Sequence, residues 1–202
     1  MNDYICINNQ KIELTGEQVA KLRESLGISN TRLSEVAVGE TFKIGEHEFV
    51  VLEHSGDTTA VIYKGLLYES VEFGSNNNYD GSNIDAILKE FTSKLIDLVG
   101  DANIAVDTVD LTSNDGLKDY GKVKRGASLL TADRYRRYVD ILDKHKIDAW
   151  WWLATPFSTE RHGSPYYVLC VSPSGDIIDY GYNGRGGVRP FCILKSNIFV
   201  SK

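Results

Sequence analysis

The sequence predicts an α+β fold, in which two helices flank small antiparallel sheets and a small hairpin–helix unit precedes the main domain. Three observations predict it. Segments rich in β-branched and aromatic residues, separated by short turns, occupy 41–68 and much of the chain after residue 150. Two segments, beginning at 83 and 132, carry apolar residues at helical spacing behind a capping residue. A length of 202 residues, 42% hydrophobic, suits one domain with an appendage.

The composition of the chain disfavours several classes of function. The net charge is −6 and the two signs are interspersed, which disfavours generic binding of nucleic acid. No apolar run reaches the roughly 20 residues of a membrane span, and the first residues lack the pattern of a signal peptide. We therefore expect a cytoplasmic protein, or a virion component released by lysis. Three cysteines without C-x-x-C spacing predict free thiols, with neither a disulfide framework nor a zinc site.

Residues 1–37 are predicted to form the appendage, and 38–202 the main domain. The segments YICI and KIEL flank the turn residues NNQ, as in a β-hairpin. Thr15 and Gln18 then form a capping box, and a helix with an apolar stripe follows until Gly27 ends it. The stripe consists of Val19, Leu22 and Leu26. Because this unit is too small to have its own core, we expect it to dock on the main domain or on a second copy.

The first half of the main domain is predicted to be an antiparallel meander followed by a helix. Strands in 41–55 and 58–68 are broken at Gly45 and at Gly56. Ser82 caps the helix, and Gly100 ends it. Its stripe consists of Ile84, Ile87, Leu88, Phe91, Leu95 and Leu98. The preceding loop, FGSNNNYDGSN, imitates the start of an EF-hand, but Ile87 stands where a bidentate glutamate is required, so no calcium site is expected.

A second long helix is predicted after Thr131, with Tyr135, Tyr138, Val139 and Leu142 on one side. Residues 118–137 are locally basic with interleaved tyrosines, which superficially suggests a nucleic-acid surface. The spacing of Asp133 with Arg137, and of Arg136 with Asp140, instead predicts i,i+4 ion pairs on a solvated helix face.

The run AWWWLATP holds all three tryptophans of the chain. In a strand Trp150 and Trp152 share one face, and Trp151 shares the other with Leu153. A continuous apolar run before a proline is typical of a strand buried on both faces. Each indole buries roughly 200 Å², which is worth several kcal/mol. We therefore assign Trp150, Trp151 and Trp152 to the structural core, with at least two inside and the third able to line a pocket or an interface.

A second apolar segment, GRGGVRPFCILK, follows the same alternation. Val188, Pro190, Cys192 and Leu194 share one face, and Arg189, Phe191 and Ile193 share the other. Pro190 requires a strand edge or a bulge. The Arg189 guanidinium is expected to stack on an indole and to donate to loop carbonyls, a structural role; direct contact with a ligand is the alternative.

The segments WWWLATP and GGVRPFCIL resemble the closing signature of an uncharacterised domain family of Gram-positive bacteria and their prophages, with Trp-Trp-Leu-x-(Ser/Thr)-Pro followed by Gly-Val-Arg-Pro. FGSNNNYDGSNI, VDLTSNDGL and SLLTADRYRRY fit too, so the resemblance covers about residues 38–202. Such domains are similar to the C-type-lectin-like fold of formylglycine-generating enzymes and of phage receptor-binding proteins. The resemblance implies a compact α+β domain whose chain ends meet, and it carries no established activity.

The candidate binding residues lie on two loops, 157–166 and 179–187, which a hairpin between them would bring together. They are Arg161, Tyr166, Tyr180, Tyr182, Asn183 and Arg185. Tyrosine, asparagine, glycine and arginine on irregular loops are typical of recognition surfaces. We therefore expect a non-enzymatic module that binds a protein or a glycan, without a cofactor or a metal, and of mobile-element origin. Homo-oligomers could form through residues 1–37.

Two other hypotheses stay open. The first is a phage-encoded inhibitor of a host defence protein, which would act through the acidic surface or the N-terminal unit. The second is an enzyme resembling copper oxidases of the related fold, in which Cys170 and Cys192 would bind Cu(I). Those enzymes use a close pair of cysteines, whereas these two lie 22 positions apart. Buried, inert thiols are therefore the favoured interpretation.

Overall fold

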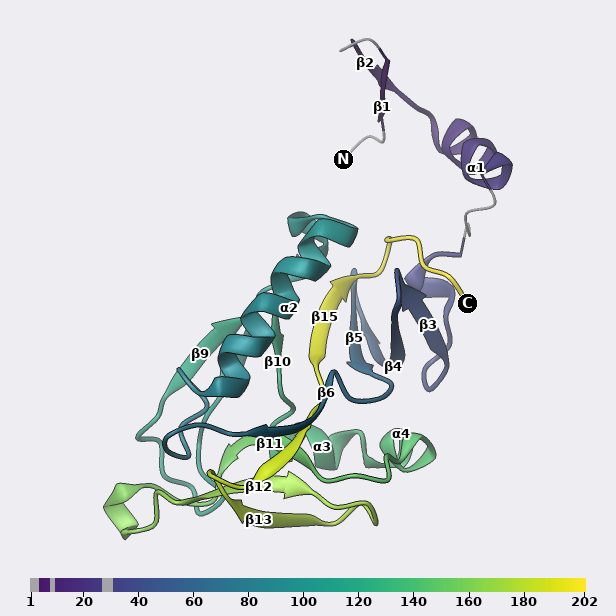
Figure 1. Cartoon of the computed structure of the whole chain (residues 1–202). Helices are drawn as coiled ribbons and strands as arrows, with labels where there is room; N and C mark the ends of the chain where they lie inside the picture. Colours follow the sequence, from purple (N-terminus) through teal and green to yellow (C-terminus); the bar gives the residue numbers. More distant parts are fainter. Residues whose placement is uncertain (1–3, 8–9, 27–30) are drawn as a thin grey trace.

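The chain forms an α+β domain with mostly antiparallel sheets, preceded by a small N-terminal unit (Figure 1). The computed structural model describes residues 4–7, 10–26 and 31–202. The larger sheet has the strand order β10-β15-β5-β4-β3, and β7 also pairs with β15. These strands are β3 (Thr41–Ile44), β4 (His47–Ser55), β5 (Thr58–Tyr63), β7 (Ile104–Ala105), β10 (Ala127–Ser128) and β15 (Phe191–Lys195). The meander β3–β4–β5 is confirmed, and Gly45 and Gly56 have positive φ at its two turns.

The second sheet has the order β13-β12-β11-β14-β6. Its strands are β6 (Tyr68–Glu72), β11 (Trp151–Pro156), β12 (Tyr167–Val171), β13 (Ile177–Gly181) and β14 (Arg185–Val188). Strand β11 pairs in parallel with β14 through Trp151 and Gly187, while the other pairs are antiparallel. Strands β8 (Asp107–Asp110) and β9 (Lys122–Arg125) form a separate hairpin. The sheet is therefore mixed, because one contact joins strands that run in the same direction.

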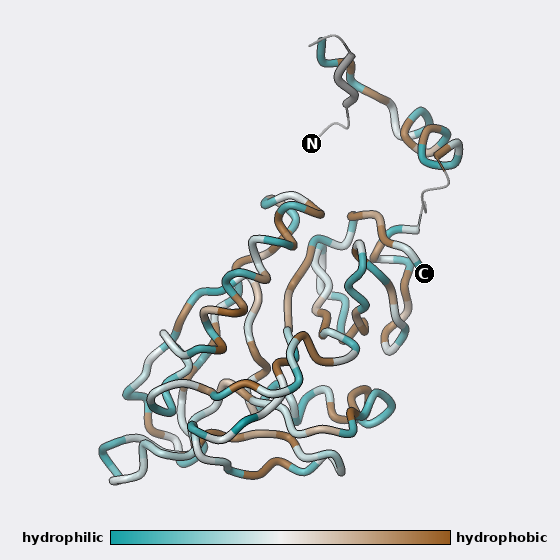
Figure 2. The backbone as a smooth tube through the Cα atoms, in the orientation of Figure 1, coloured by the Kyte–Doolittle hydropathy of each residue, from teal (hydrophilic) through white to brown (hydrophobic). Residues whose placement is uncertain are grey.

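Helix α2 (Asn83–Val99) begins and ends where the sequence predicts. The Ser82 hydroxyl accepts from the backbone of Asp85, and Gly100 ends the helix with φ 85°. Apolar and polar residues alternate around it, as the colours of Figure 2 show, and Ile84, Leu88, Phe91 and Leu95 are buried. Leu98 departs from the predicted stripe: it is half exposed, while Ile96 and Val99 of the same turn pack against the core.

The second helix is shorter than predicted, because it breaks at Tyr138. Helix α3 (Ala132–Arg137) is followed by α4 (Val139–Leu142) and by a 3-10 turn (Asp143–His145). Tyr138 has φ −107° and ψ 12°, and its hydroxyl donates to Glu53 at 2.7 Å. Val139 consequently turns outward, while Tyr135, Tyr138 and Leu142 stay buried.

The three arginines of helix α3 form ion pairs, but with other partners than the i,i+4 spacing predicts. Arg136 pairs with Asp133 three residues before it, and Arg137 pairs with Glu53 of β4. Arg134 binds Asp107 through two bonds. The prediction of Asp133–Arg137 and Arg136–Asp140 pairs is therefore wrong, because helix α3 ends at Arg137 and the chain turns toward β4.

Arg125 of β9 makes the most buried of these ion pairs. Its Nε lies 2.6 Å from Oδ1 of Asp85, whose side chain is fully buried, and its Nη2 reaches Asp80 at 2.6 Å. Lys89 also contacts Asp85, at 2.8 Å. Burial opposes ionisation of Asp85, but the bonds from Arg125 and Lys89 outweigh it and hold the pKa of Asp85 below its ordinary value. This ion pair joins helix α2 to the β8–β9 hairpin.

Strand β11 is buried along its whole length and separates two apolar clusters. Trp152 packs with Ala154, Val168 and Cys170 in the first cluster, and Trp151 packs with Leu153 and Leu169 in the second. This division follows the predicted alternation of faces. The prediction that at least two of the three indoles lie inside is confirmed by Trp151 and Trp152, but the assignment of Trp150 to the core is wrong, since its side chain is 43% exposed. Trp150 precedes the first strand residue, so the pleat of β11 does not direct it inward.

Arg189 and Pro190 lie where the chain leaves one sheet for the other. Strand β14 ends at Val188 and β15 begins at Phe191, so the predicted single strand is two strands in different sheets. Pro190 lacks the N–H that a continuous ladder needs, and its carbonyl accepts from Tyr63 at 2.8 Å. Val188, Cys192 and Leu194 share the first cluster, while Phe191 belongs to the second.

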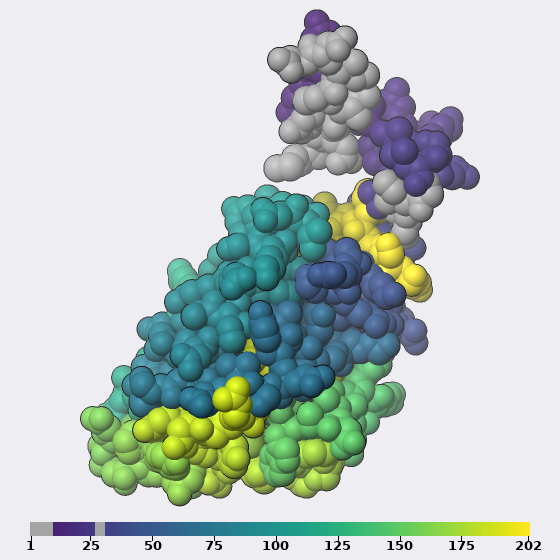
Figure 3. Space-filling model, in the orientation of Figure 1, coloured from purple at the N-terminus to yellow at the C-terminus, as the bar shows by residue number. Residues whose placement is uncertain are grey.

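The N-terminal unit consists of β1 (Tyr4–Ile7), β2 (Gln10–Glu13) and helix α1 (Gly16–Ser25). The hairpin is confirmed, and both bonds of the Thr15–Gln18 capping box are present. The predicted end of the helix at Gly27 lies outside the described residues. Helix α1 buries none of its residues, and its stripe residues Leu22 and Leu26 are exposed. The unit stands out from the main body in Figure 3, and Arg23 contacts the Phe199 ring at 4.1 Å.

The main domain begins earlier than residue 38. Leu33 and Val36 are fully buried in the first apolar cluster. Arg32 pairs with Phe199 and Lys43 with Ser201, so the two ends of the domain meet. The polar composition of 31–40 hides this, because only two of the apolar residues in that range, Leu33 and Val36, face the core. None of the helices in the described ranges is long and apolar enough to cross a membrane.

Candidate recognition surface

The hairpin of β12 and β13 brings the two candidate loops together. Tyr167 pairs with Gly181 at its open end, and the backbone N–H of Tyr182 donates to the carbonyl of Tyr166 at 3.0 Å. The segments 157–166 and 179–187 therefore lie side by side at the end of the domain opposite the chain termini (Figure 1). The sequence predicted this proximity on the condition that a hairpin forms.

Three of the candidate residues are in direct contact. The Tyr166 hydroxyl donates to Oδ1 of Asn183 at 2.6 Å, and the Tyr166 and Tyr182 rings meet edge to face at 5.0 Å between centroids. Tyr167 packs against Tyr166 at 4.9 Å and against Phe157 at 6.3 Å. Rings in edge-to-face contact hold one another in fixed orientations. We call Phe157, Tyr166, Tyr167, Tyr180, Tyr182 and Asn183 the tyrosine surface.

Two glycines make this packing possible. A Cβ at Gly181 would lie 2.7 Å from the Tyr166 ring, and a Cβ at Gly184 would lie 2.1 Å from the Tyr180 ring. Any larger residue would displace these rings. Tyr180 also lies on the indole of Trp152 at 5.8 Å, with 34° between the ring planes. The buried strand β11 thus supports an exposed tyrosine directly.

The two candidate arginines point away from the tyrosine surface. Arg161 forms an ion pair with Asp119. Arg185 reaches along β6, where it donates to the hydroxyl and the carbonyl of Ser70, both at 3.1 Å, and contacts Glu72 at 3.5 Å. Of the six candidate residues, the structure brings together Tyr166, Tyr182 and Asn183, with Tyr180 close by on the Trp152 indole. A ligand-binding role for any of them stays a prediction.

A buried asparagine closes the base of the 157–167 loop. The Asn77 amide donates to the carbonyls of Ser158 and Tyr167, at 2.8 and 2.9 Å. Its oxygen accepts from the Tyr120 hydroxyl at 2.7 Å. Asn77 is fully buried and lies in the polar loop before helix α2. Three satisfied bonds at one buried side chain fix both ends of the loop.

Two aspartates of the 111–121 loop hold the outer part of the same loop. Asp115 accepts from Ser158 at 2.7 Å and from His162 at 2.9 Å, and Asp119 accepts from Thr159 at 2.6 Å. Hydrogen bonds from Ser113, Ser158 and His162 hold the pKa of Asp115 well below its ordinary value. The Asp115 carboxylate therefore binds the loop as an anion at neutral pH.

Arg189 lies in the core on the Trp151 side of strand β11. It is 1% exposed, donates to the carbonyls of Tyr63, Lys64 and His145 at 3.0, 3.2 and 3.2 Å, and lies 5.2 Å from the Trp151 ring centroid. These contacts are the indole stacking and carbonyl binding expected from the sequence. Burial lowers the pKa of Arg189 to about 10.

The two cysteines whose side chains are described are buried and protonated. Cys170 of β12 and Cys192 of β15 are both free and buried. Burial raises the pKa of each thiol to about 12. Both are therefore protonated at neutral pH, whereas a soft metal requires thiolates. Cys6 lies in strand β1, where no side chain is described.

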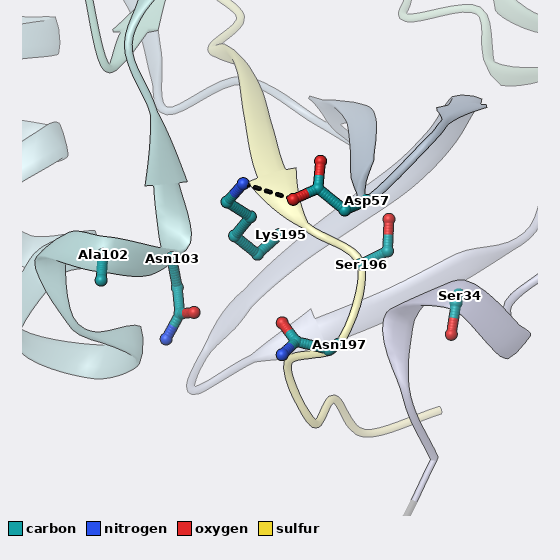
Figure 4. A pocket seen from close by; sticks show the side chains of 7 residues that line it. All are labelled: Ser34, Asp57, Ala102, Asn103, Lys195, Ser196 and Asn197. Atoms are coloured by element: carbon teal, nitrogen blue, oxygen red, sulfur yellow. Dashed lines mark hydrogen bonds and ion pairs between the residues drawn. The ribbon is translucent and has the colours of Figure 1, made fainter. Parts of the chain in front are cut away.

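A polar cleft of about 400 Å³ lies at the other end of the domain, near the end of β15 (Figure 4). Lys195 and Asp57 neutralise each other there at 2.6 Å. The Ser196 hydroxyl is bonded to Thr59 at 2.8 Å. The cleft therefore presents amides and hydroxyls, with no unpaired charge among its described lining residues. It contains no residue that the sequence singled out.

The sequence missed Phe157, Tyr167, Asn77, Asp115 and Asp119. The pair Tyr166–Tyr167 beside a proline was a signal for Tyr167, since a strand begins at that residue. Nothing local marks Asn77, because its partners lie 81 and 90 positions away.

A family model described as a domain of unknown function, DUF6273, matches residues 105–196. The matched segment runs from β7 to the residue after β15, so the chain is similar to this family over the part that carries the tyrosine surface, Arg189 and strand β11. It covers somewhat less than half of the chain, and the description carries no activity. No curated protein and no solved structure matches the chain.

Proposed function

We propose that the protein is a non-enzymatic recognition module, which binds a protein or a glycan through the tyrosine surface. One observation carries the proposal: exposed aromatic rings from two loops are gathered beside Asn183 and held in place by a buried network. Tyr166, Tyr167 and Tyr180 are 39 to 46% exposed, although each also packs on another ring. Rigid rings that stay accessible provide contact area at a low entropic cost.

The anchoring of the loops supports binding. Asn77, Asp115 and Asp119 fix the 157–167 loop before any ligand arrives. Preorganisation lowers the entropic cost of association. A flat group, such as a sugar ring or a peptide plane, can stack on the tyrosines while the Asn183 amide supplies hydrogen bonds.

Several features favour recognition over catalysis. Ser158 and His162 both bind Asp115 and, in the part of the chain that the structure describes, are not bonded to each other, so they lack the serine–histidine bond of a nucleophilic triad. Among the described residues, no three His, Cys, Asp or Glu side chains gather as a metal site requires. Cys170 and Cys192 are both free and buried, and burial raises the pKa of each thiol, which favours inert thiols over the copper oxidase hypothesis.

We propose further that the domain is C-type-lectin-like. The meeting of the chain ends, the flanking helices and the small antiparallel sheets support this assignment. In that fold, irregular loops bind ligands and the sheets stabilise the domain. The division of this chain into loops at 157–185 and a core around β11 agrees with that arrangement.

The test uses two defined probe sets, a glycan array and a panel of purified bacterial and phage surface proteins. A ligand supports the proposal if Tyr166→Ser weakens its binding at least tenfold while Tyr68→Ser does not. Tyr68 is a matched control, because it is equally exposed but lies on β6. Ligands that bind both variants equally, or an absence of binding to both sets, would overturn the proposal.

A further inference from the structure

Strand β13 forms one edge of the second sheet. It pairs with β12 along its whole length, from Ile177 to Gly181, without a shift of register. In the described part of the chain no other strand pairs with its outer side, and Figure 1 shows it at the margin of the domain beside β12. The outer side of β13 therefore presents backbone rather than a packed neighbour.

Two hydrogen bonds at the ends of the β12–β13 ladder fix its phase. The N–H of Ser172 donates to the carbonyl of Asp176 at 2.9 Å, next to the turn. At the open end, the N–H of Tyr182 donates to the carbonyl of Tyr166 at 3.0 Å. Hydrogen-bonded and non-hydrogen-bonded pairs alternate along an antiparallel ladder. Every second residue of β13, counted from either end, must therefore bond to β12.

This phase decides which backbone groups point outward. Ile178 and Tyr180 bond to β12, through Cys170 and Val168 opposite them. The N–H and C=O of Ile177 and Asp179 consequently point away from β12. No backbone or side-chain group among the described residues bonds to these outward groups. They are a row of donors and acceptors at the spacing that an added strand requires.

The other edges of the two sheets are covered. At β3, Lys43 exchanges two backbone bonds with Ser201, at 2.7 and 3.1 Å. At β10, the N–H of Ala127 donates to the hydroxyl of Thr92 in helix α2, at 3.0 Å. At β6, side chains of Arg185, Trp152 and Asn83 donate to successive carbonyls, those of Ser70, Val71 and Glu72. Among these edges, β13 is thus the one to which the described chain supplies no partner.

The charge of Asp179 limits what can pair with this edge. Its side chain is exposed and has neither a hydrogen bond nor an ion pair within the described residues. Asp179 is also the middle residue of β13. Full-length antiparallel pairing with a second copy would therefore set two Asp179 carboxylates opposite each other, and like charges in that position destabilise a ladder. A basic residue opposite Asp179 has the contrary effect.

We propose that the β13 edge binds an extended segment of a partner protein in which basic and apolar residues alternate. The segment adds an antiparallel strand to the sheet, and its main chain bonds to the outward groups of Ile177 and Asp179. A lysine or arginine lies opposite Asp179. Its two neighbours in the segment point to the other face of the sheet, beside Ile178 and Tyr180, where apolar side chains extend the packing of those residues. The net charge of −6 steers a basic segment toward the protein.

The probe is an acetylated and amidated heptapeptide, Val-Lys-Val-Lys-Val-Lys-Val, added to the full chain. Amide hydrogen exchange is followed by NMR. Without peptide, the N–H groups of Ile177 and Asp179 are expected to exchange fast, and those of Ile178 and Tyr180 slowly. The peptide is expected to slow exchange at Ile177 and Asp179. No change at these two amides at about 1 mM peptide, or protection confined to other strands, would overturn the proposal.

Two N-methylated peptides test the backbone pairing without changing the charge. In the proposed register the N–H groups of the lysines face β13, and those of the valines face away. Methylation of the lysine amides is expected to weaken binding roughly tenfold or more, because the bonds to β13 are lost. Methylation of the central valine amides is expected to change affinity less than about threefold. Equal affinity of the two methylated peptides would contradict strand addition.

Two protein variants test the charge. Asp179→Asn is expected to weaken binding roughly threefold, since the cross-strand ion pair is lost, and to keep the melting temperature because Asp179 has no partner to lose. Asp97→Asn removes one charge from an exposed site on α2 and is expected to have an effect below about 1.5-fold. Equal effects of the two variants would overturn the pairing of a basic residue with Asp179. Tyr166→Ser is expected to leave heptapeptide binding within about twofold, which separates this test from that of the proposed function.

Discussion

Replacement of Arg189 by alanine is expected to lower the free energy of unfolding by about 3 kcal/mol. Arg189 donates three hydrogen bonds to carbonyls from a charged group, and at about 2 kcal/mol each these contribute roughly 6 kcal/mol. Burial opposes the charge, since it lowers the pKa of Arg189 from 12.5 to about 10, which corresponds to about 3 kcal/mol. The difference between these two contributions, about 3 kcal/mol, is the expected loss in the free energy of unfolding.

The measurement is urea unfolding followed by circular dichroism, with a thermal scan beside it. For a chain of this length, about 3 kcal/mol corresponds to a melting temperature roughly 10 °C lower. Arg189→Lys keeps the charge without the planar fork and is expected to fall between wild type and Arg189→Ala.

Arg185→Ala is the matched control. Its guanidinium is 62% exposed and makes only surface contacts, so a change within about 0.5 kcal/mol is expected. A larger loss from Arg185→Ala than from Arg189→Ala would refute the assignment of one arginine to the scaffold and the other to the surface.

Three further predictions concern single groups. In a Cys6→Ser background, Cys170 and Cys192 are expected to resist a thiol reagent at pH 8 until the protein unfolds, because burial raises the pKa of both to about 12. Rapid reaction of either thiol in the folded protein would contradict the burial of these two side chains. Asp85→Asn is expected to lower stability at pH 7 by about 3 kcal/mol, because Arg125 keeps its burial, loses the buried carboxylate and retains only the more exposed Asp80 as an ionic partner. Because the pKa of Asp85 is lowered in the folded protein, its contribution to stability is present above about pH 4 and is lost as the pH falls further. The acid-induced loss of stability should therefore be shallower in Asp85→Asn than in the wild type. An unchanged pH profile of stability would count against this role of Asp85. Iodide is expected to quench the fluorescence of Trp150 alone among the three indoles, so Trp150→Phe should abolish most of the quenching. Quenching of Trp150→Phe as strong as that of the wild type would show that the core indoles are exposed to solvent.

The sequence was informative wherever the cause of a structure lies within a few residues. The Thr15–Gln18 capping box, the Ser82 cap and the Gly100 end of α2 each depend on neighbours in the chain. The alternation of Trp151 and Trp152 between two apolar clusters follows from the strand pleat alone.

The tertiary structure decided everything that depends on distant partners. The sequence could name Arg161 and Arg185 as recognition residues, but not that Asp119 and Ser70 would engage them from 42 and 115 positions away. The sequence could not predict that Trp150 is exposed, because its exposure depends on the residue at which strand β11 begins. Local rules fix caps, turns and faces through short-range sterics and backbone bonds, whereas the partner of a long polar side chain is chosen by the three-dimensional packing of segments far apart in sequence.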